Sequence, residues 1–274
     1  NSKNFDLSII SSPTSLHIKQ GIEIAKKKIH ILMEKPLDSD LQNIEVFNNL
    51  VNKNKLVVMM AYVFRFSPLI KKVKDLITNN VIGKVYFARG EFSEYLPDWH
   101  PYEDYRSFYM SEKKLGGGSI LDQSHIMDLI HFLLGDFEGV FSFNGNLSNL
   151  ELNSDDYAEL LVKLKSGVVV SLHTDIFGRD HKKQLEIKGE FGNIYWDHYE
   201  NSVKLYLSEN KNYELFKSFP SDFNLNYLDE IKHFINCCEK KVDCISPLSN
   251  GIDTMKLIEA AKKANETGIY QIVV

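Results

Sequence analysis

The fold is decided by residues 5–37, FDLSIISSPTSLHIKQGIEIAKKKIHILMEKPL. This stretch predicts a short buried strand in FDLSII, a helix in TSLHIKQGIEIAKKK with Thr14 or Ser15 at its N-cap, and a second strand in IHILM. The same order continues, because DSDLQNIEVFNNLVNKN predicts a helix with Asp38 or Ser39 near its cap and KLVVMMAYV predicts a third strand. A β-α-β-α-β unit of this kind requires a parallel sheet with right-handed crossovers.

Such a unit is half of a doubly wound nucleotide-binding domain, whose first half carries a G-x-G-x-x-G fingerprint directly after a buried strand. This sequence has no such fingerprint. Its run of glycines, residues 116–118, follows the charged segment YMSEKKL rather than a strand, and the chain starts with Asn1 rather than Met. We therefore expect a fragment that lacks the first half of the domain. The alternative is a complete chain with three parallel strands on that side.

After Tyr62 the pattern changes to that of a second domain. SPLIKKVKDLITNN predicts a helix opened by Pro68, and GKVYFARGEFSEYL predicts a strand. Short alternating runs over residues 140–219 predict a largely antiparallel sheet with one face covered, and two helices and a last strand, YQIVV, close the chain. The predicted fold class is α/β: a partial doubly wound, Rossmann-type parallel domain in residues 1–62, followed by an α+β domain with a large, mostly antiparallel sheet in residues 63–274.

Composition excludes several classes of protein. The 274 residues carry a net charge of -5 with scattered lysines, so we expect no nucleic-acid partner. No run approaches the roughly 18 apolar residues of a membrane span, and the N-terminus lacks the features of a signal peptide, so we expect a cytoplasmic protein without a membrane partner. Cys237, Cys238 and Cys244 have neither disulfide nor zinc spacing, and we expect free thiols and no metal site.

Two predicted strand ends carry candidate ligand-binding residues, because ligands of open α/β sheets bind outside the carboxyl ends of the strands. MEKPL places Lys35 at the end of the second strand, where an ammonium group can reach a ligand. The alternative is a solvated pair of Glu34 and Lys35 before a proline that stops the strand. SSPT, at the end of the first strand, has small residues that permit close approach of a cofactor, although a plain turn before a helix explains them nearly as well.

The segment GGGSILDQSHIMD, residues 116–128, leads into a predicted helix over residues 119–134. Asp122 and His125 are three residues apart and share one helix face beside the apolar stripe. A histidine with an aspartate one turn away, after glycines that permit close approach, favours an acid–base or substrate-binding role over a satisfied core histidine. Metal binding by Asp122, His125 and Asp128 is disfavoured, because no further histidine or cysteine at zinc spacing accompanies them.

A third group of candidates lies in residues 94–109, EYLPDWHPYEDYRSFY. Its aromatic side chains, Trp99 and Tyr105 among them, suit the face of a sugar ring, and Arg106 offers a planar fork for a carboxylate or phosphate. We therefore expect a sugar or sugar derivative as substrate, with a preference for one that carries a negative group. The alternatives are a packed surface loop, and an Arg106 that pairs with Glu103 or Asp104 on the loop, in which case a neutral sugar fits equally well.

Several of these pieces, in this order, make the chain resemble the Gfo/Idh/MocA family of NAD(P)-dependent oxidoreductases. The matching stretches are IISSPTSLH, EKPL, YVFRFSPLI followed by IGKV, and GGGSILDQSHIMDLIHFLLG. The resemblance implies hydride transfer between NAD or NADP and a hydroxyl or keto carbon of a sugar. It also implies a homodimer or homotetramer formed through the antiparallel sheet.

The resemblance assigns site residues as well. Lys35 of the E-K-P motif is the implied catalytic lysine, and His125 and Asp122 are the implied acid–base and substrate-binding residues. The family pattern D-x-G-x-H is one residue longer than the segment from Asp122 to His125, so His125 ranks above Asp122. The candidate substrate-binding residues are therefore Asp122 and His125 from the resemblance, together with Trp99, Tyr105 and Arg106 from the aromatic segment. The implied cofactor-binding residues are Ser12, Pro13, His17, Glu34, Lys35, Pro36 and Arg65.

Two other functions stay open at this point. One is a non-catalytic sugar-binding or scaffold protein that uses the second domain, and the other is an enzyme that retains NAD and uses transient oxidation to cleave a glycosidic bond. Lys35 separates the first from an oxidoreductase, because a binding module has no need of a lysine beside the cofactor.

Overall fold

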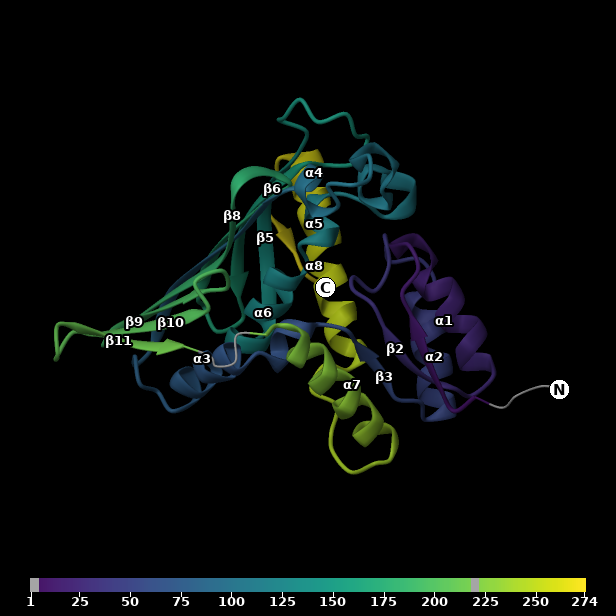
Figure 1. Ribbon diagram of the computed structural model, residues 1–274, viewed down its shortest axis with the longest axis horizontal. Coiled ribbons are helices and arrows are strands. Elements are labelled where there is room, and N and C mark those ends of the chain that lie inside the picture. Colours follow the sequence, from purple (N-terminus) through teal and green to yellow (C-terminus); the bar gives the residue numbers. More distant parts are fainter. Residues whose placement is uncertain (1–4, 218–221) are drawn as a thin grey trace.

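Residues 5–217 and 222–274 are described by a computed structural model of the chain. Residues 1–4 and 218–221 lie outside the described part, and with them the end of the predicted antiparallel region at Phe219. Two sheets organise the molecule (Figure 1), a three-stranded parallel sheet near the N-terminus and a nine-stranded sheet at the other end. The long helix α8, Leu248–Thr267, lies between them.

The parallel sheet has the predicted β-α-β-α-β connectivity. Its strands β1, Leu7–Ile10, β2, His30–Met33, and β3, Val58–Met60, pair in the order β1-β2-β3. The helices α1, His17–Lys26, and α2, Ile44–Asn54, pack against each other. The carboxyl ends of β1 and β2 therefore meet at one edge, where SSPT and EKPL follow.

The second helix is shorter than predicted, and Asp38 does not cap it. Oδ2 of Asp38 accepts a hydrogen bond from the backbone N–H of Ile18 at 3.0 Å, so Asp38 satisfies an amide in the first turn of α1. Burial raises the pKa of Asp38 above its ordinary value. The bond from Ile18 to Asp38 fastens the end of the EKPL segment to α1.

The larger sheet is mostly antiparallel, as predicted, with one parallel pair between β4 and β7. Its strand order is β11-β10-β9-β8-β4-β7-β6-β5-β12. The strands are β4 Val85–Tyr95, β5 Phe137–Gly145, β6 Tyr157–Leu164, β7 Val169–Asp175, β8 Phe177–Gly189, β9 Gly192–Asp197, β10 Ser202–Leu207, β11 Asn212–Lys217 and β12 Gln271–Ile272. The sequence did not predict β11, because this edge strand exposes nearly all of its side chains and lacks an apolar alternation.

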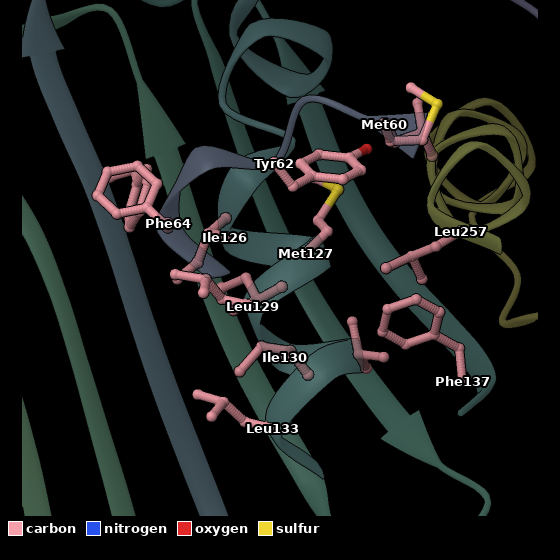
Figure 2. Close-up of a cluster of buried hydrophobic side chains, with 14 of the residues drawn as sticks. Met60, Tyr62, Phe64, Ile126, Met127, Leu129, Ile130, Leu133, Phe137 and Leu257 are labelled. Carbon is pink, nitrogen blue, oxygen red and sulfur yellow. The ribbon is translucent and has the colours of Figure 1, made fainter. Parts of the chain in front are cut away.

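Helices cover one face of the larger sheet, and the other face is open to solvent. The covering helices are α3 Pro68–Thr78, α5 Ser119–Asp122, α6 His125–Leu134 and α8. Figure 2 shows the buried stripe of α6, with Ile126, Ile130 and Leu133, packed beside Phe137 of β5 and Leu257 of α8. This cluster also takes in Met60 and Tyr62 at the end of the parallel unit, so one core joins the two parts of the chain.

The predicted helix over residues 119–134 is divided into α5 and α6. At the junction the amides of Ser124 and Ile126 donate to carbonyls three residues back, Leu121 and Gln123, instead of four. This local tightening is of the 3-10 type and turns the chain between the two short helices. Asp122 thereby ends α5 and His125 begins α6.

The remaining helical elements are α4 Leu96–Trp99, α7 Asn224–Cys238, and the 3-10 turns Thr14–Leu16, Val63–Phe66, Tyr105–Ser107, Tyr109–Ser111 and Lys113–Leu115. The prolines of residues 94–109 do not prevent helical turns, since Pro97 lies in the first turn of α4, where its missing N–H leaves no bond unmade. No helix in residues 5–217 and 222–274 is long and apolar enough to cross a membrane. The cytoplasmic location and the domain boundary after residue 62 stay predictions.

Candidate active site

Lys35 and Asp122 meet where the end of β2 faces the end of α5. Nζ of Lys35 donates to the backbone oxygen of Asp122 at 2.7 Å and to its Oδ1 at 2.9 Å. The two side chains are 14% and 9% exposed, so the pair is sheltered but reachable. An ammonium group has three donors, and Asp122 uses two of them. One N–H of Lys35 therefore stays available for a ligand.

Tyr109 completes this arrangement. Its hydroxyl donates to Oδ1 of Asp122 at 3.2 Å. The negative charge of Asp122, together with burial, raises the pKa of Tyr109, so its hydroxyl keeps the proton. The sequence placed Tyr109 in the aromatic segment but did not select it. The available signal was its position just before the glycine run, which brings it to the same junction.

The glycine run explains how α5 comes this close to β1. Gly116 has φ +81°, and a Cβ there would lie 2.6 Å from Cβ of Thr14, the first residue of the 3-10 turn that follows β1. Gly118 has φ +117°, and a Cβ there would lie 2.3 Å from Oδ1 of Asp155. Asp155 in turn accepts a hydrogen bond from the amide of Ile120 at 2.8 Å. The glycines thus serve close packing and a left-handed backbone, which side chains would forbid.

His17 connects the segments that follow β1 and β2. Its ring nitrogens lie 2.8 Å from the backbone oxygens of Pro36 and Ser12, and the side chain is 1% exposed. The peptide bond between Lys35 and Pro36 is cis. Both ring nitrogens therefore face backbone oxygens inside the protein, and His17 holds the two loops on which Lys35 and Ser12 lie. Its role as a cofactor ligand stays a prediction.

His125 stands at the start of α6 among aromatic rings. The rings of Tyr62 and Phe64 approach it edge-on, with centroids 5.8 and 5.1 Å away. Burial, and then the positive charge of Lys35, hold the pKa of His125 well below its usual range, so the imidazole is neutral. Its Nδ1 is buried and has no hydrogen-bond partner among the described residues. A neutral imidazole beside a lysine suits a proton acceptor.

A second polar group, which the sequence did not identify, lies next to His125 on the covered face of the sheet. Glu94 of β4 receives Nζ of Lys183 at 3.0 Å, the hydroxyl of Tyr199 at 2.5 Å and Nε2 of Gln123 at 3.1 Å. These contacts hold the pKa of Glu94 below its ordinary value against the effect of burial. Lys183 also lowers the pKa of His125, which places the two groups close to each other.

The sequence held a signal for this group. In HKKQLEIKG, Lys183 occupies the same face as the core residues Leu185 and Ile187. His198 follows Trp196 in the same way, and burial lowers its pKa to about 4. A charged residue at an inward position of an alternating strand is uncommon without a partner or a role.

Glu230 is a further acidic group that was not predicted. It is 3% exposed, and its Oε1 has no hydrogen-bond partner among the described residues. Burial, and then the nearby charge of Glu34, raise its pKa to about 8. The signal in the sequence was a polar pair in the buried stripe of α7, because Asn226, Glu230 and Phe234 are spaced by four residues.

The predicted sugar-binding residues of the loop, Trp99, Tyr105 and Arg106, all have partners within the protein, and their role in binding stays a prediction. Trp99 and Tyr105 pack on a separate apolar cluster with Leu96 and Met110. Arg106 is 55% exposed and pairs with Asp104 and with Glu151, each at 2.7 Å, which agrees with the alternative that it pairs on its own loop. In residues 5–217 and 222–274 no hydrogen bond or ion pair connects these three side chains to Lys35 or His125.

Arg65 forms a buried ion pair with Asp128. Nε and Nη2 donate to Asp128 at 2.9 and 2.6 Å, and Nη1 donates to the backbone oxygen of Ile245. The side chain is 2% exposed. These bonds tie α6 to the turn after β3 and to the segment after α7, and the role of Arg65 at the cofactor stays a prediction.

Lys35 lies where the parallel unit meets α5, and comparison with known proteins identifies this arrangement as that of a nicotinamide-dependent oxidoreductase. Residues 1–62 match the family model described as oxidoreductase family, NAD-binding Rossmann fold, and residues 70–195 match the GFO/IDH/MocA C-terminal domain. The chain belongs to the Gfo/Idh/MocA family of oxidoreductases, which confirms the predicted family, fold class and enzyme class.

Relatives and solved structures agree with this assignment. Myo-inositol 2-dehydrogenase of Thermotoga maritima is 26% identical, over 96% of this chain and 78% of its own. The scyllo-inositol 2-dehydrogenase (NAD(+)) of Bacillus subtilis is also 26% identical, over 85% of this chain and 67% of its own. A structure of levoglucosan dehydrogenase in complex with NADH and levoglucosan shares the fold, with a TM-score of 0.88 and 18% identity over 98% of this chain and 80% of that chain.

Proposed function

We propose that this protein transfers hydride between a nicotinamide cofactor and a secondary alcohol or ketone of a sugar or ring polyol, with Lys35 and His125 at the reacting oxygen. The observation that carries the proposal is the contact of Lys35 with Asp122, made beside a neutral histidine. This pair fixes an ammonium group with one free N–H at the junction of the two parts of the chain.

The residues at the strand ends fit a nicotinamide group. Oε1 of Glu230 is buried without a partner among the described residues, and Glu34 adds a second acidic group near it. A ring that brings positive charge and amide donors would satisfy both carboxyl groups. Ser12, Pro13 and Pro36 would hold the cofactor together with Glu34, from loops that His17 joins. When bound, the cofactor supplies the acceptor or donor of the hydride.

Proton transfer falls to the residues of this chain. An alcohol gives up hydride readily only if its hydroxyl proton leaves, and the neutral imidazole of His125 can accept that proton. The free N–H of Lys35 can donate a hydrogen bond to the same oxygen and stabilise the charge that develops there. Asp122 and Tyr109 keep the ammonium group in place.

The substrate is proposed to be neutral rather than anionic. Arg106, the group expected to bind an anion, already has two carboxylate partners. The polar groups near His125 include both hydrogen-bond donors and an acceptor. Lys183 and Tyr199 both donate to the carboxylate of Glu94, so the positive and negative charges of this group offset each other. Such a set suits several hydroxyl groups. The names of the two inositol dehydrogenase relatives support the same class of substrate.

The test is a panel of inositols, sugars and sugar acids assayed with NAD and the purified protein. Lys35→Met should lower kcat by about a thousandfold, since it removes the polar group at the reacting oxygen. The matched control is Lys53→Met, an exposed lysine of α2 that should keep wild-type activity. Unchanged kcat in Lys35→Met would refute the proposal. Cleavage of a glycoside without net NADH formation would favour transient oxidation, and binding without turnover would favour a scaffold.

We also propose that two or four copies associate through the open face of the larger sheet. This face carries exposed apolar side chains at its edge, with Tyr213 62% and Leu215 55% exposed. A groove of about 720 Å³ crosses it, lined by Arg89, Tyr195 and Lys204 among others. Leu215→Asp should reduce the mass measured by light scattering to that of a monomer, whereas Leu147→Asp, 67% exposed in a loop, should not. An unchanged mass for Leu215→Asp would contradict this interface.

A further inference from the structure

Three soft ligand side chains gather at the end of α7, away from the site of Lys35. His233 and Cys237 are one helical turn apart and share a face, with Sγ of Cys237 3.4 Å from Nε2 of His233. Cys244, from the segment after the helix, completes the group. The three potential ligand atoms all lie within 4.8 Å of one another.

The ring of His233 is already oriented for ligation. Its Nε2 accepts a hydrogen bond from the backbone N–H of Ile245 at 3.0 Å, so Nε2 carries the lone pair and the proton resides on Nδ1. The ring of Phe66, with its centroid 5.5 Å away, packs against it. A metal ion at Nε2 would need no change of tautomer, and it would displace the hydrogen bond from Ile245 and the contact with Sγ of Cys237.

We propose that His233, Cys237 and Cys244 form a Zn²⁺ site with the fourth position open to water. Two thiolates and an imidazole are soft and borderline ligands, which favour zinc over magnesium or calcium. Binding releases one proton from each thiol, and no oxidant or reductant is required. Zn–S and Zn–N bonds of about 2.3 and 2.0 Å set tetrahedral ligands roughly 3.5–3.8 Å apart, so small rotations of the side chains close the site.

The surroundings agree with a site of three protein ligands. Cys237 is buried at 4% exposure, whereas His233 and Cys244 are partly exposed and leave a path for the ion and for water. The apolar cluster beneath, with Met59, Phe66 and Phe234, offers no competing oxygen ligand from its side chains. The sequence predicted free thiols and no metal site at Cys237 and Cys244, and His233 was not a candidate. Cys244 reaches the pair of His233 and Cys237 only because the chain turns back beyond α7.

A zinc ion bound by these three side chains would link α7 to the segment that follows it. That segment carries the backbone oxygen of Ile245, which accepts from Arg65, and Pro247, which bridges to Met59 of β3. The ion would therefore stabilise the link between α7 and the parallel unit, without contact with Lys35. The inference stands independently of the proposed reaction.

The experiment uses the full chain purified with a non-thiol reductant, stripped of metal and titrated with Zn²⁺ and with Co²⁺. We expect one ion per chain, a Co²⁺ spectrum with sulfur-to-metal charge-transfer bands, and a rise in Tm on adding zinc. The extended X-ray absorption fine structure of bound zinc should be fitted by two sulfurs and two light atoms, the histidine nitrogen and a water oxygen. Cys244→Ser should weaken binding by about a hundredfold, as expected for loss of one of a few ligands. Cys238→Ser is the matched control, because Cys238 is adjacent but lies outside the group, and it should bind zinc as the wild type does.

Several outcomes would overturn the inference. They are less than one tenth of an ion per chain, a Co²⁺ spectrum without sulfur bands, or equal losses in Cys238→Ser and Cys244→Ser. The spectrum of the wild-type protein tests the ligand set even if the Cys244→Ser variant does not fold. A disulfide between Cys237 and Cys244 that persists under reductant and excludes zinc would also contradict it.

Discussion

Replacement of Asp122 by Asn tests the geometry of the active site most directly. Oδ1 of Asp122 receives two donors, Nζ of Lys35 at 2.9 Å and the hydroxyl of Tyr109 at 3.2 Å. The backbone oxygen of residue 122, which also binds Nζ at 2.7 Å, is untouched by the substitution. Asp122→Asn therefore keeps the shape of the site and one bond to Lys35, and removes only the negative charge.

The size of the effect follows from the bonds that are weakened. A hydrogen bond to a charged group contributes about 1.5–3 kcal/mol, and the Lys35–Asp122 pair is sheltered enough for that range to apply. If this contribution to stabilising the transition state is lost, kcat should decrease roughly tenfold to hundredfold. Since Asp122 is the main cause of the raised pKa of Tyr109, that pKa should fall toward its ordinary value in the variant.

Two assays check these effects separately. NADH formation at saturating substrate gives kcat, and absorbance of tyrosinate during an alkaline titration follows Tyr109, with Tyr109→Phe to assign the signal. Asp104→Asn is the control, because Asp104 is a half-exposed carboxylate whose side chain pairs with Arg106 away from the site. The reasoning fails if Asp122→Asn keeps the wild-type kcat, or if Asp104→Asn loses as much.

Three further predictions concern the side chains of His125, Glu230 and Arg106. The lowered pKa of His125 implies that no loss of kcat/KM between pH 7 and 6 arises from it; a limb near the ordinary histidine pKa that disappears in His125→Gln would contradict this. Glu230, with a folded pKa of about 8 against 4.5, binds a proton that the unfolded chain releases, so stability should fall as pH rises from about 4.5 to about 8. Glu230→Gln should raise Tm at pH 8 and change it little at pH 4, and an equal pH dependence of Tm in both proteins would refute the assignment. Arg106→Ala should change KM for anionic and neutral sugars to the same small extent, and a tenfold loss confined to anions would restore the first expectation for Arg106.

The sequence by itself determined the parts of the fold that depend on local periodicity. The β-α-β-α-β order of residues 5–60 and the alternation of β6 and β9 follow from apolar spacing, and spacing is a property of neighbouring residues. Lys35 was predicted as a site residue because parallel strands present their carboxyl ends at one edge of the sheet. The residues that follow β2 are therefore candidates for ligand binding from the sequence alone.

Only the tertiary structure decided which polar groups meet. Lys35 and Asp122 are 87 residues apart, and Asp38 caps α1 rather than the helix that follows it. Arg106 had several possible partners within reach, and no local pattern chooses among them. Glu230 and His233 acquire their character from what packs around them, because burial and distant charges set a pKa or assemble a ligand group. Periodicity fixes the face on which a side chain lies, whereas its partner depends on how helices and sheets pack across the whole chain.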